Sequence, residues 1–433
     1  MVSRLEGKGI GRLAKNTGFL YVMSLSSQVI NLVLIPFQTR VLGSEAYGFI
    51  SLAVSMSTIV TIVLDFGFIL SATERAVRLV GDNEGLARLL ANVARAKLAL
   101  ALAFGAIVAT LIACVPPFCD NRILFSLYYL AYAVNAFLPD FFYRGHEDMR
   151  TITVRTVAIK VISALPIFVF LHGPADMWVV PALLLLGNAG AVVFSYYDVS
   201  HRYGIVPAGG AVRESLQLLR SSLGFFVSRF ASVFYQSLNA VLLGFVYPGQ
   251  AVVGHYGAAE KFLSYTKTLS SPVADSLYPY MVRTKNYRLC ILTLAIACPI
   301  ILVSAVAAWV FADSLCLFVF GPGYEGAATL LRCLMPAIVV IFPTYILCFP
   351  MLVPMGLSNL ANRSNVIGAL VQVLLIGILV ATGTFSAPTL CIAASASEVS
   401  VFLFRLWAVV SNRHLLRKTS SAAELATFEK AKE

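Results

Sequence analysis

The stretch SLSSQVINLVLIPFQTRVLGSEAYG, residues 24–48, places polar side chains inside an apolar run. Ser24, Gln28 and Asn31 occupy positions i, i+4 and i+7, which lie on one face of a helix. The surrounding run, from about residue 18 to residue 37, is long enough to cross a bilayer, and lipid offers an amide side chain no hydrogen-bond partner. The stretch therefore predicts a membrane helix whose polar face is turned toward protein or water.

The composition excludes an ordinary soluble domain. Hydrophobic residues make up 59% of the 433 residues and charged residues 12%, which is typical of a polytopic membrane protein. The formal net charge of +11 comes without a basic stripe that alternates with aromatic residues, so we expect no nucleic-acid partner. The acidic residues, histidines and cysteines show no spacing typical of a catalytic or metal site, so we expect neither, and no bound cofactor.

Apolar runs of about 20 residues predict about twelve spans, so the expected fold class is an all-α polytopic membrane protein. The expected spans cover residues 17–37, 48–71, 97–118, 122–142, 152–172, 177–197, 222–246, 252–281, 289–312, 327–355, 364–384 and 388–411. They divide into two halves of six. We expect an N-terminal six-helix bundle over residues 1–200, a cytoplasmic linker over 201–221, a C-terminal six-helix bundle over 222–412 and a cytoplasmic tail over 413–433.

The loops differ in their content of Lys and Arg. One set, which includes both chain ends and the loops at 72–97 and 143–155, carries most of these residues. The opposite loops carry only Arg40, Arg122 and Arg332. Because basic residues favour the cytoplasmic side, we expect both termini in the cytoplasm.

The opening pattern recurs in SVFYQSLNAVLLGFVYPGQAVVGHYG, residues 232–257. Gln28 and Asn31 match Gln236 and Asn239 at one constant offset. Six spans per half is an even number, so the halves have the same orientation and form a parallel repeat about an axis along the membrane normal. Transporters built in this way bind substrate between the halves, which predicts that the four amides line one central cavity. The alternative is that they form hydrogen bonds between helices.

Charged residues extend the polar faces of the seventh and eighth spans. Arg229 lies on the face of Gln236 and Asn239. A charge at the centre of a bilayer costs from about 2.5 kcal/mol upward, so such a residue usually faces a bundle interior or water. Arginine and lysine suit phosphate, whereas serine and amide side chains suit sugar hydroxyls. The cavity is therefore expected to bind an anionic amphiphile with a large polar head.

The eighth span has a charged face of its own. Glu260, Lys267 and Asp275 share this face with two serines, and Lys261 lies at its edge. We interpret Lys267 as a cavity residue, with pairing inside the helix as the alternative. Five further charges lie within or at the border of spans: Asp65, Asp140, Lys160, Glu398 and Arg405.

Four stretches of the sequence resemble a known protein family. FQTRVLGSEAYGFISLAVS, residues 37–55, and VLDFGFILSATERAVRLVGD, residues 63–82, resemble the N-terminal signature of bacterial polysaccharide repeat-unit flippases of the Wzx type. YGAAEKF, residues 256–262, and LFVFGPGYEGAATLLRCLMPAI, residues 317–338, add to the resemblance. These flippases share a superfamily with the MATE drug exporters and the lipid II flippase.

The resemblance implies two six-helix bundles in a V shape that alternates between the two faces of the membrane. It implies that undecaprenyl-diphosphate-linked oligosaccharide moves from the cytoplasmic to the periplasmic leaflet of a bacterial inner membrane, for O-antigen or another surface polysaccharide. Expected partners are this cargo, membrane lipids, and a polymerase or other assembly proteins.

The resemblance also implies roles for the charged residues. Arg229, Lys261 and Lys267 would contact diphosphate or acidic sugar, and Arg40 would receive the cargo during release. Coupling to H⁺ or Na⁺ would fall to the acidic residues Asp65, Glu260 and Asp275.

Two rivals belong to other classes. A MATE-type multidrug or cation antiporter needs an acid-rich lumen, whereas the first span, residues 17–37, contains no acidic residue. A membrane-embedded polysaccharide polymerase or ligase is expected to carry a large outer loop with Arg or His, and the outer loops here are short. The lipid II flippase is a further rival, but it is expected to have two more C-terminal spans, for which this chain has no room.

Overall fold

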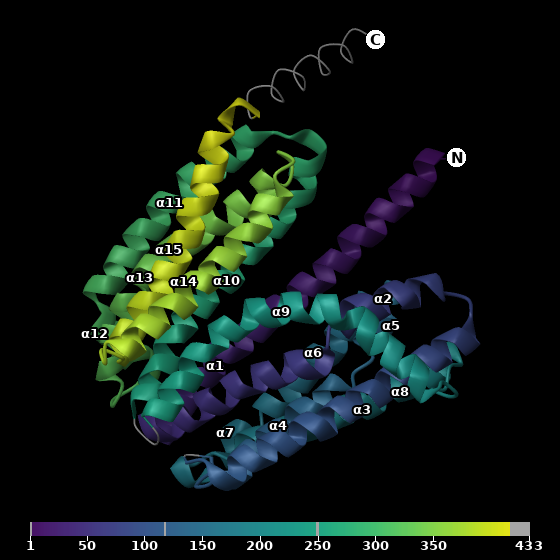
Figure 1. Ribbon diagram of the computed structural model, residues 1–433, viewed down its shortest axis with the longest axis horizontal. Helices are drawn as coiled ribbons and strands as arrows, with labels where there is room; N and C mark the ends of the chain where they lie inside the picture. The colour runs from purple at the N-terminus through teal and green to yellow at the C-terminus, as the bar shows by residue number, and fades with distance from the viewer. Residues whose placement is uncertain (1, 117, 248–250, 416–433) are drawn as a thin grey trace. The chain divides into compact units, whose positions relative to one another are not determined.

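The computed structural model describes residues 2–116, 118–247 and 251–415, and within these ranges the side chains of Arg229 and Gln236 lie outside the description. Every regular element in the described ranges is a helix. Contacts between Cα atoms divide the chain into two compact units, Met1–Gly254 and His255–Glu433. Each unit is considered by itself (Figure 1).

The first unit is built from the following elements: α1 (Val2–Asp65), α2 (Phe68–Arg78), α3 (Asn83–Cys114), α4 (Arg122–Ala136), α5 (Asp140–Gly145), α6 (Met149–Ala164), α7 (Ile167–Phe170), the 3-10 turn η1 (Pro174–Asp176), α8 (Val179–Tyr203) and α9 (Val212–Val246). The helix α1 packs against α4, α6 and α9, and α4 packs against α3 and α8. Figure 1 shows α3, α4 and α8 side by side. Phe68, Phe142 and Tyr143 are fully buried in a core cluster of this unit.

A backbone break divides α1. Gly43 has φ 74° and ψ 174°, outside the helical region and accessible to glycine without a Cβ clash. The sequence predicts two spans here, residues 17–37 and 48–71, and the break falls between them. Nine helical segments of the described residues are long and apolar enough to cross a membrane, and the segment Tyr21–Arg78 alone has 58 residues. These segments confirm a multi-pass all-α membrane protein, while the count of twelve spans stays a prediction.

Side-chain caps mark several helix starts. The Asp82 carboxylate accepts a 2.9 Å hydrogen bond from the Gly85 amide at the start of α3. Asp148 caps α6 in the same way, and Ser386 caps α15. A cap satisfies one of the free N–H groups of the first helical turn. These short polar residues therefore set where the apolar runs begin as helices.

Glycines allow the closest backbone contact in the first unit. A Cβ atom placed on Gly254 would lie 1.9 Å from the Ser44 carbonyl oxygen, and one placed on Gly48 would lie 2.9 Å from the Gly254 amide nitrogen. Gly48 belongs to the repeated Tyr-Gly motif of the sequence. The small residues thus bring the second half of α1 against the first turn of the next helix, α10 (Ala251–Thr284).

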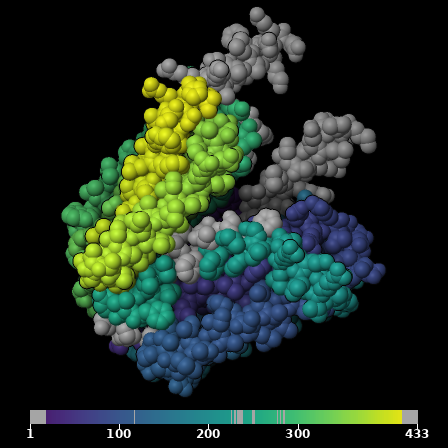
Figure 2. Space-filling model, viewed as in Figure 1, coloured from purple at the N-terminus to yellow at the C-terminus, as the bar shows by residue number. Residues whose placement is uncertain are grey.

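The second unit contains most of α10, followed by α11 (Tyr287–Val310), α12 (Ala312–Phe320), α13 (Glu325–Ile346), the π-helical turn η2 (Leu347–Leu352), α14 (Ser358–Ala381) and α15 (Ala387–Ser411). The helix α15 packs against α13 and α14, and Figure 2 shows α14 and α15 side by side in light green and yellow. Buried Arg405 joins these helices: its guanidinium donates to the Thr344 carbonyl, Ser364 Oγ and Asn365 Oδ1 at 2.9, 2.8 and 2.7 Å.

Two residues at predicted borders between loop and span are buried. Lys97 and Arg155 fall where the basic loops 72–97 and 143–155 overlap the predicted spans 97–118 and 152–172. Both lie within helices, with exposed fractions of 5% and 4%. They lie at the ends of apolar runs, where hydropathy does not separate a loop residue from a buried one. The structure also places α9 in contact with α1 and α3 of the first unit. The predicted bundle limits, with a linker over 201–221, stay a prediction.

Candidate functional site

In the second unit, an ion pair joins α10 to α15. Lys267 Nζ lies 2.7 Å from Glu398 Oε1, and the two side chains are 23% and 18% exposed. An ion pair this shielded from solvent is held more tightly than a surface pair, and removing one partner leaves an unpaired charge. The sequence singled out Lys267 as a cavity residue and placed Glu398 at the border of a span. The structure joins them.

Other predicted residues of α10 have local partners. Lys261 Nζ lies 3.9 Å from Glu260 Oε2, and both side chains are partly exposed. The Ser271 hydroxyl donates a 2.9 Å hydrogen bond to the exposed Asp275 carboxylate. The charged face expected on this helix is therefore present, and its acids and bases interact with neighbours. The proposed roles of these residues in cargo binding or ion coupling stay predictions.

A charged pocket lies inside the first unit, with a volume of about 230 Å³. Its lining includes Asp65 from the end of α1, Lys97 from α3, and Asp140 and Arg144 from α5. Lys97 Nζ donates a 2.5 Å hydrogen bond to the Ala136 carbonyl. The structure thus brings Asp65, a predicted ion-coupling residue, to a site that also holds two cations and a second carboxylate.

A buried arginine anchors one of these carboxylates. Arg155 forms an ion pair with Asp140, and its other terminal nitrogen donates a 3.0 Å hydrogen bond to Ser195 Oγ. Sequence reasoning missed both Lys97 and Arg155 as site residues. The available signal was that each begins or interrupts an apolar helical run.

The structure describes part of the predicted polar face of the repeat. Gln28 and Asn31 are partly buried on α1, Arg40 is exposed, and Asn239 on α9 is buried. All four belong to the first unit. Gln236, the predicted counterpart of Gln28, and Arg229, which is expected on the same face as Gln236, have side chains outside the described residues. The prediction that these residues share a cavity therefore stays a prediction.

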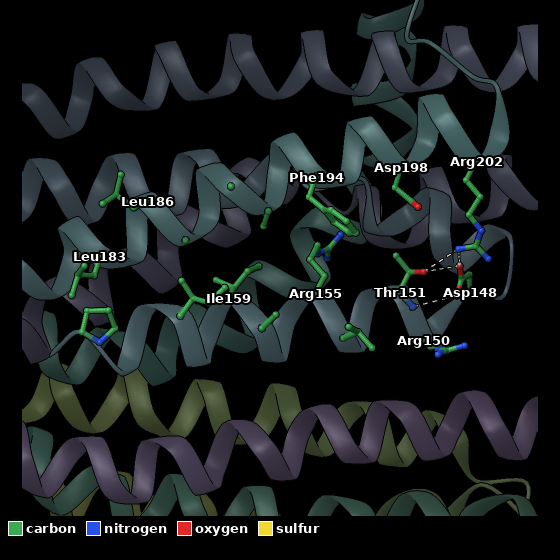
Figure 3. Close-up of a pocket in the computed structure, with 17 residues that line it drawn as sticks. Asp148, Arg150, Thr151, Arg155, Ile159, Leu183, Leu186, Phe194, Asp198 and Arg202 are labelled. Carbon is green, nitrogen blue, oxygen red and sulfur yellow. Dashed lines mark hydrogen bonds and ion pairs between the residues drawn. The ribbon is translucent and has the colours of Figure 1, made fainter. Parts of the chain in front are cut away.

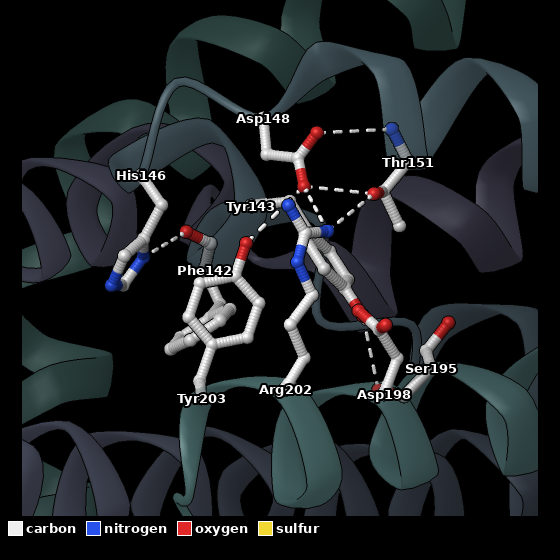
Figure 4. Close-up of polar contacts among 9 residues, drawn as sticks. All are labelled: Phe142, Tyr143, His146, Asp148, Thr151, Ser195, Asp198, Arg202 and Tyr203. Atoms are coloured by element: carbon white, nitrogen blue, oxygen red, sulfur yellow. Dashed lines mark hydrogen bonds and ion pairs between the residues drawn. The ribbon is translucent and has the colours of Figure 1, made fainter.

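A polar cluster connects the ends of α6 and α8 (Figure 4). The Asp148 carboxylate accepts hydrogen bonds from the Thr151 amide and hydroxyl at 3.2 and 2.8 Å and from Arg202 at 2.7 Å. Burial acts to raise the pKa of Asp148, but the hydrogen bonds from Thr151 and the charge of Arg202 outweigh it and lower the pKa below its ordinary value. The Tyr143 hydroxyl donates to Asp198 at 2.9 Å. These contacts fix the two helix ends relative to each other.

Within the described part of the chain, no group of three His, Cys, Asp or Glu residues is placed to hold a metal ion. The candidate sites therefore consist of cations, carboxylates and amides inside the helix bundles.

A model of the polysaccharide biosynthesis protein family matches residues 13–285. The chain belongs to this family. The match confirms the resemblance carried by residues 37–55 and 63–82, which both lie inside the matched range.

Two curated relatives of this polysaccharide biosynthesis protein cover most of its length. A protein of Shigella dysenteriae, described as a candidate O-antigen transporter, is 25% identical over 412 residues, which make up 92% of this chain and all of the relative. A protein of Escherichia coli (strain K12) with the same description is 23% identical over 340 residues, which make up 75% of this chain and 79% of the relative.

Solved structures share the fold. An inward-facing MATE family multidrug resistance transporter of the MOP superfamily aligns with a TM-score of 0.66 and 15% identity, over 91% of this chain and 96% of the transporter. The lipid II flippase MurJ in an inward closed conformation aligns with a TM-score of 0.63 and 11% identity, over 94% of this chain and 91% of the flippase. At such identities the likeness shows the fold alone, which this chain shares with both transporters.

Proposed function

We propose that this polysaccharide biosynthesis protein flips undecaprenyl-diphosphate-linked oligosaccharide repeat units from the cytoplasmic to the periplasmic leaflet. The flipped units serve the assembly of O-antigen or another surface polysaccharide. The observation that carries the proposal is the family match, together with full-length alignment to a candidate O-antigen transporter. The fold is also found in a lipid II flippase, so a lipid-linked cargo is compatible with it.

The charged residues give the proposal a physical basis. A diphosphate that leaves water needs compensating positive charge, because an isolated anion in a medium of low dielectric is strongly unfavourable. Lys267 supplies such a charge and is held by Glu398 when no cargo is present. An arriving phosphate competes with Glu398 for the ammonium group. The cation then stays paired throughout, at the cost of separating the Glu398 carboxylate from this lysine.

Transport is proposed to proceed by alternating access and to couple to H⁺ or Na⁺. Asp65 is the favoured coupling residue, because the pocket of the first unit brings it together with Asp140 and Lys97. Glu260 and Asp275 are the other candidates. We further propose that both termini are cytoplasmic and that a polymerase or another assembly protein takes over the flipped unit.

The enzyme alternative, a polysaccharide polymerase or ligase, loses support because both curated relatives are described as transporters. A MATE family transporter has the same fold at 15% identity, but a shared fold at this identity does not indicate what this chain transports. The paired cation of α10 favours an anionic cargo over a cationic drug.

The deciding experiment is deletion of the gene, followed by localisation of the lipid-linked repeat unit. We expect the unit to accumulate in the cytoplasmic leaflet, surface polysaccharide to disappear, and both effects to be reversed by a plasmid copy of the chain. Accumulation of the repeat unit in the periplasmic leaflet would instead mean that this protein acts after the translocation step. Normal display with increased sensitivity to cationic drugs would favour the antiporter.

A further inference from the structure

A long groove runs between α6 and α8 in the first unit, with a volume of about 890 Å³ (Figure 3). One end is apolar and is lined by Leu183 and Leu186. Ile159 and Phe194 continue the apolar lining toward the middle. The groove therefore offers hydrocarbon contact over most of its length.

The other end of the groove is charged. Arg150, Asp148 and Arg202 lie there, together with Thr151 and Asp198. The carboxylates are already engaged, since Asp148 accepts from Thr151 and Arg202, and Asp198 accepts from Tyr143. This end belongs to the loops that the Lys and Arg distribution places on the cytoplasmic side.

Arg150 carries a positive charge that no ion pair with a described acidic group neutralises. Its side chain is exposed, and no acidic group of the described residues forms an ion pair with it. Arg202 is 54% exposed and has donors beyond the one that meets Asp148. Two guanidinium groups at the mouth of an apolar groove fit a phosphate group whose hydrocarbon chain enters the groove.

The length of the groove distinguishes between kinds of lipid. Leu183 and Arg202 are both on α8, and a helix rise of 1.5 Å per residue separates them by about 28 Å. The hydrocarbon core of a bilayer is about 30 Å thick, so the acyl chain of a phospholipid in one leaflet covers about half of the groove. A chain that fills it is longer than one leaflet.

A glycine leaves the middle of the groove open. A Cβ atom placed on Gly190 would meet no heavy atom within 4 Å, although this residue lines the groove. One turn earlier, a Cβ on Gly187 would lie 2.3 Å from Ser163 Oγ, so there α6 and α8 touch. The groove thus has a closely packed floor at Gly187 and free space beside Gly190.

We propose that this groove binds the polyprenyl chain of a lipid diphosphate, with the phosphates beside Arg150 and Arg202 and the chain directed toward Leu183. The inference rests on the proposed function and deepens it, because it assigns the lipid part of the cargo to α6 and α8. The sugar part is then free to follow a separate polar path.

The test uses the purified full chain and measures binding of undecaprenyl diphosphate by native mass spectrometry. Gly190→Phe fills the groove, and we expect it to weaken binding at least about tenfold. Replacement of a helical glycine raises helix propensity, so a folding defect is not expected. The matched control is Val193→Phe, which adds the same ring to α8 at a side chain that is 70% exposed and outside the groove. Arg150→Glu should weaken binding as well, by repulsion.

Competition experiments decide the identity of the lipid. We expect phosphatidylglycerol and farnesyl diphosphate to compete poorly, because each fills only part of the groove. Equal competition by phosphatidylglycerol, or equal binding by Gly190→Phe and Val193→Phe, would overturn the inference. The gene deletion tests the flippase proposal separately. If the deletion abolishes surface polysaccharide but Gly190→Phe binds undecaprenyl diphosphate normally, the groove proposal is rejected and the flippase proposal stands.

Discussion

Lys267 on α10 and Glu398 on α15 form an ion pair of 2.7 Å, although 131 residues separate them in the chain. The pair fastens two helices of the second unit at a depth where both side chains are mostly shielded from solvent. It also changes how a mutation at Lys267 is interpreted, because loss of the lysine leaves a carboxylate without its partner. Binding of cargo and stability of the bundle have to be separated by paired variants.

The double variant Lys267→Met/Glu398→Gln provides that separation. It removes both charges together, so the cost of an unpaired buried charge, about 1–3 kcal/mol for each single variant, does not arise. If Lys267 binds the diphosphate, we expect the double variant to reach the membrane at the normal level and to display little surface polysaccharide. Glu398→Gln alone should retain display, since the cation remains. Normal display from the double variant would reduce Lys267 to a structural role.

Gly254 is expected to tolerate no side chain. Its Cβ would lie 1.9 Å from the Ser44 carbonyl oxygen, which belongs to the backbone and has no freedom to move alone. We expect Gly254→Ala to destabilise the first unit by about 3 kcal/mol or more and to lower the amount of protein in the membrane. Gly224→Ala on α9 is the matched control, because a Cβ there meets no heavy atom within 4 Å. Thermal unfolding of the two purified variants measures the difference.

The Asp148 cluster predicts a loss of stability in acid. The pKa of this carboxyl is lowered in the folded protein, so its contribution is fully present above the ordinary carboxyl pKa of 3.8 and declines as the pH falls through the folded value. We expect the melting temperature of the wild type to fall below about pH 4, where protonation begins. Asp148→Asn should be less stable at pH 7 and should show a smaller acid-dependent decrease. Identical pH profiles for the two proteins would contradict this assignment.

Several features of the fold follow from the sequence for simple physical reasons. The alternation of long apolar runs and short polar segments predicts a multi-pass helical protein, and the break in α1 falls between two predicted spans at Gly43. The short motifs at 37–55 and 63–82 lead to the correct family. These signals are local, so a single sequence carries them.

The partners of buried charges could not be predicted in the same way. Helical periodicity places Lys267 on a polar face, but its partner Glu398 lies on a helix that is remote in sequence, and only packing brings them together. Lys97 and Arg155 lie at the ends of apolar runs, where a charged side chain either reaches water or turns inward. Hydropathy assigns the same score to both outcomes, which is why the predicted loops and spans overlap at these two residues.

The pocket of the first unit contains two carboxylates with different surroundings, and this difference predicts different phenotypes. Asp140 pairs with Arg155, whose side chain is only 2% exposed, so Asp140→Asn leaves a buried guanidinium without its charge partner. We expect this variant to lose about 3 kcal/mol or more of stability and to be depleted from the membrane.

Asp65 lines the same pocket, and as the proposed coupling residue it should tolerate Asn structurally. Asp65→Asn is therefore expected to keep a normal protein level, to lower polysaccharide display per molecule several-fold, and to abolish the dependence of flipping on external pH or Na⁺. The measurement is display normalised to membrane protein for both variants across a pH and Na⁺ series. Depletion of Asp65→Asn to the level of Asp140→Asn would give Asp65 a structural role, and normal display with unchanged ion dependence would move the coupling to Glu260 or Asp275.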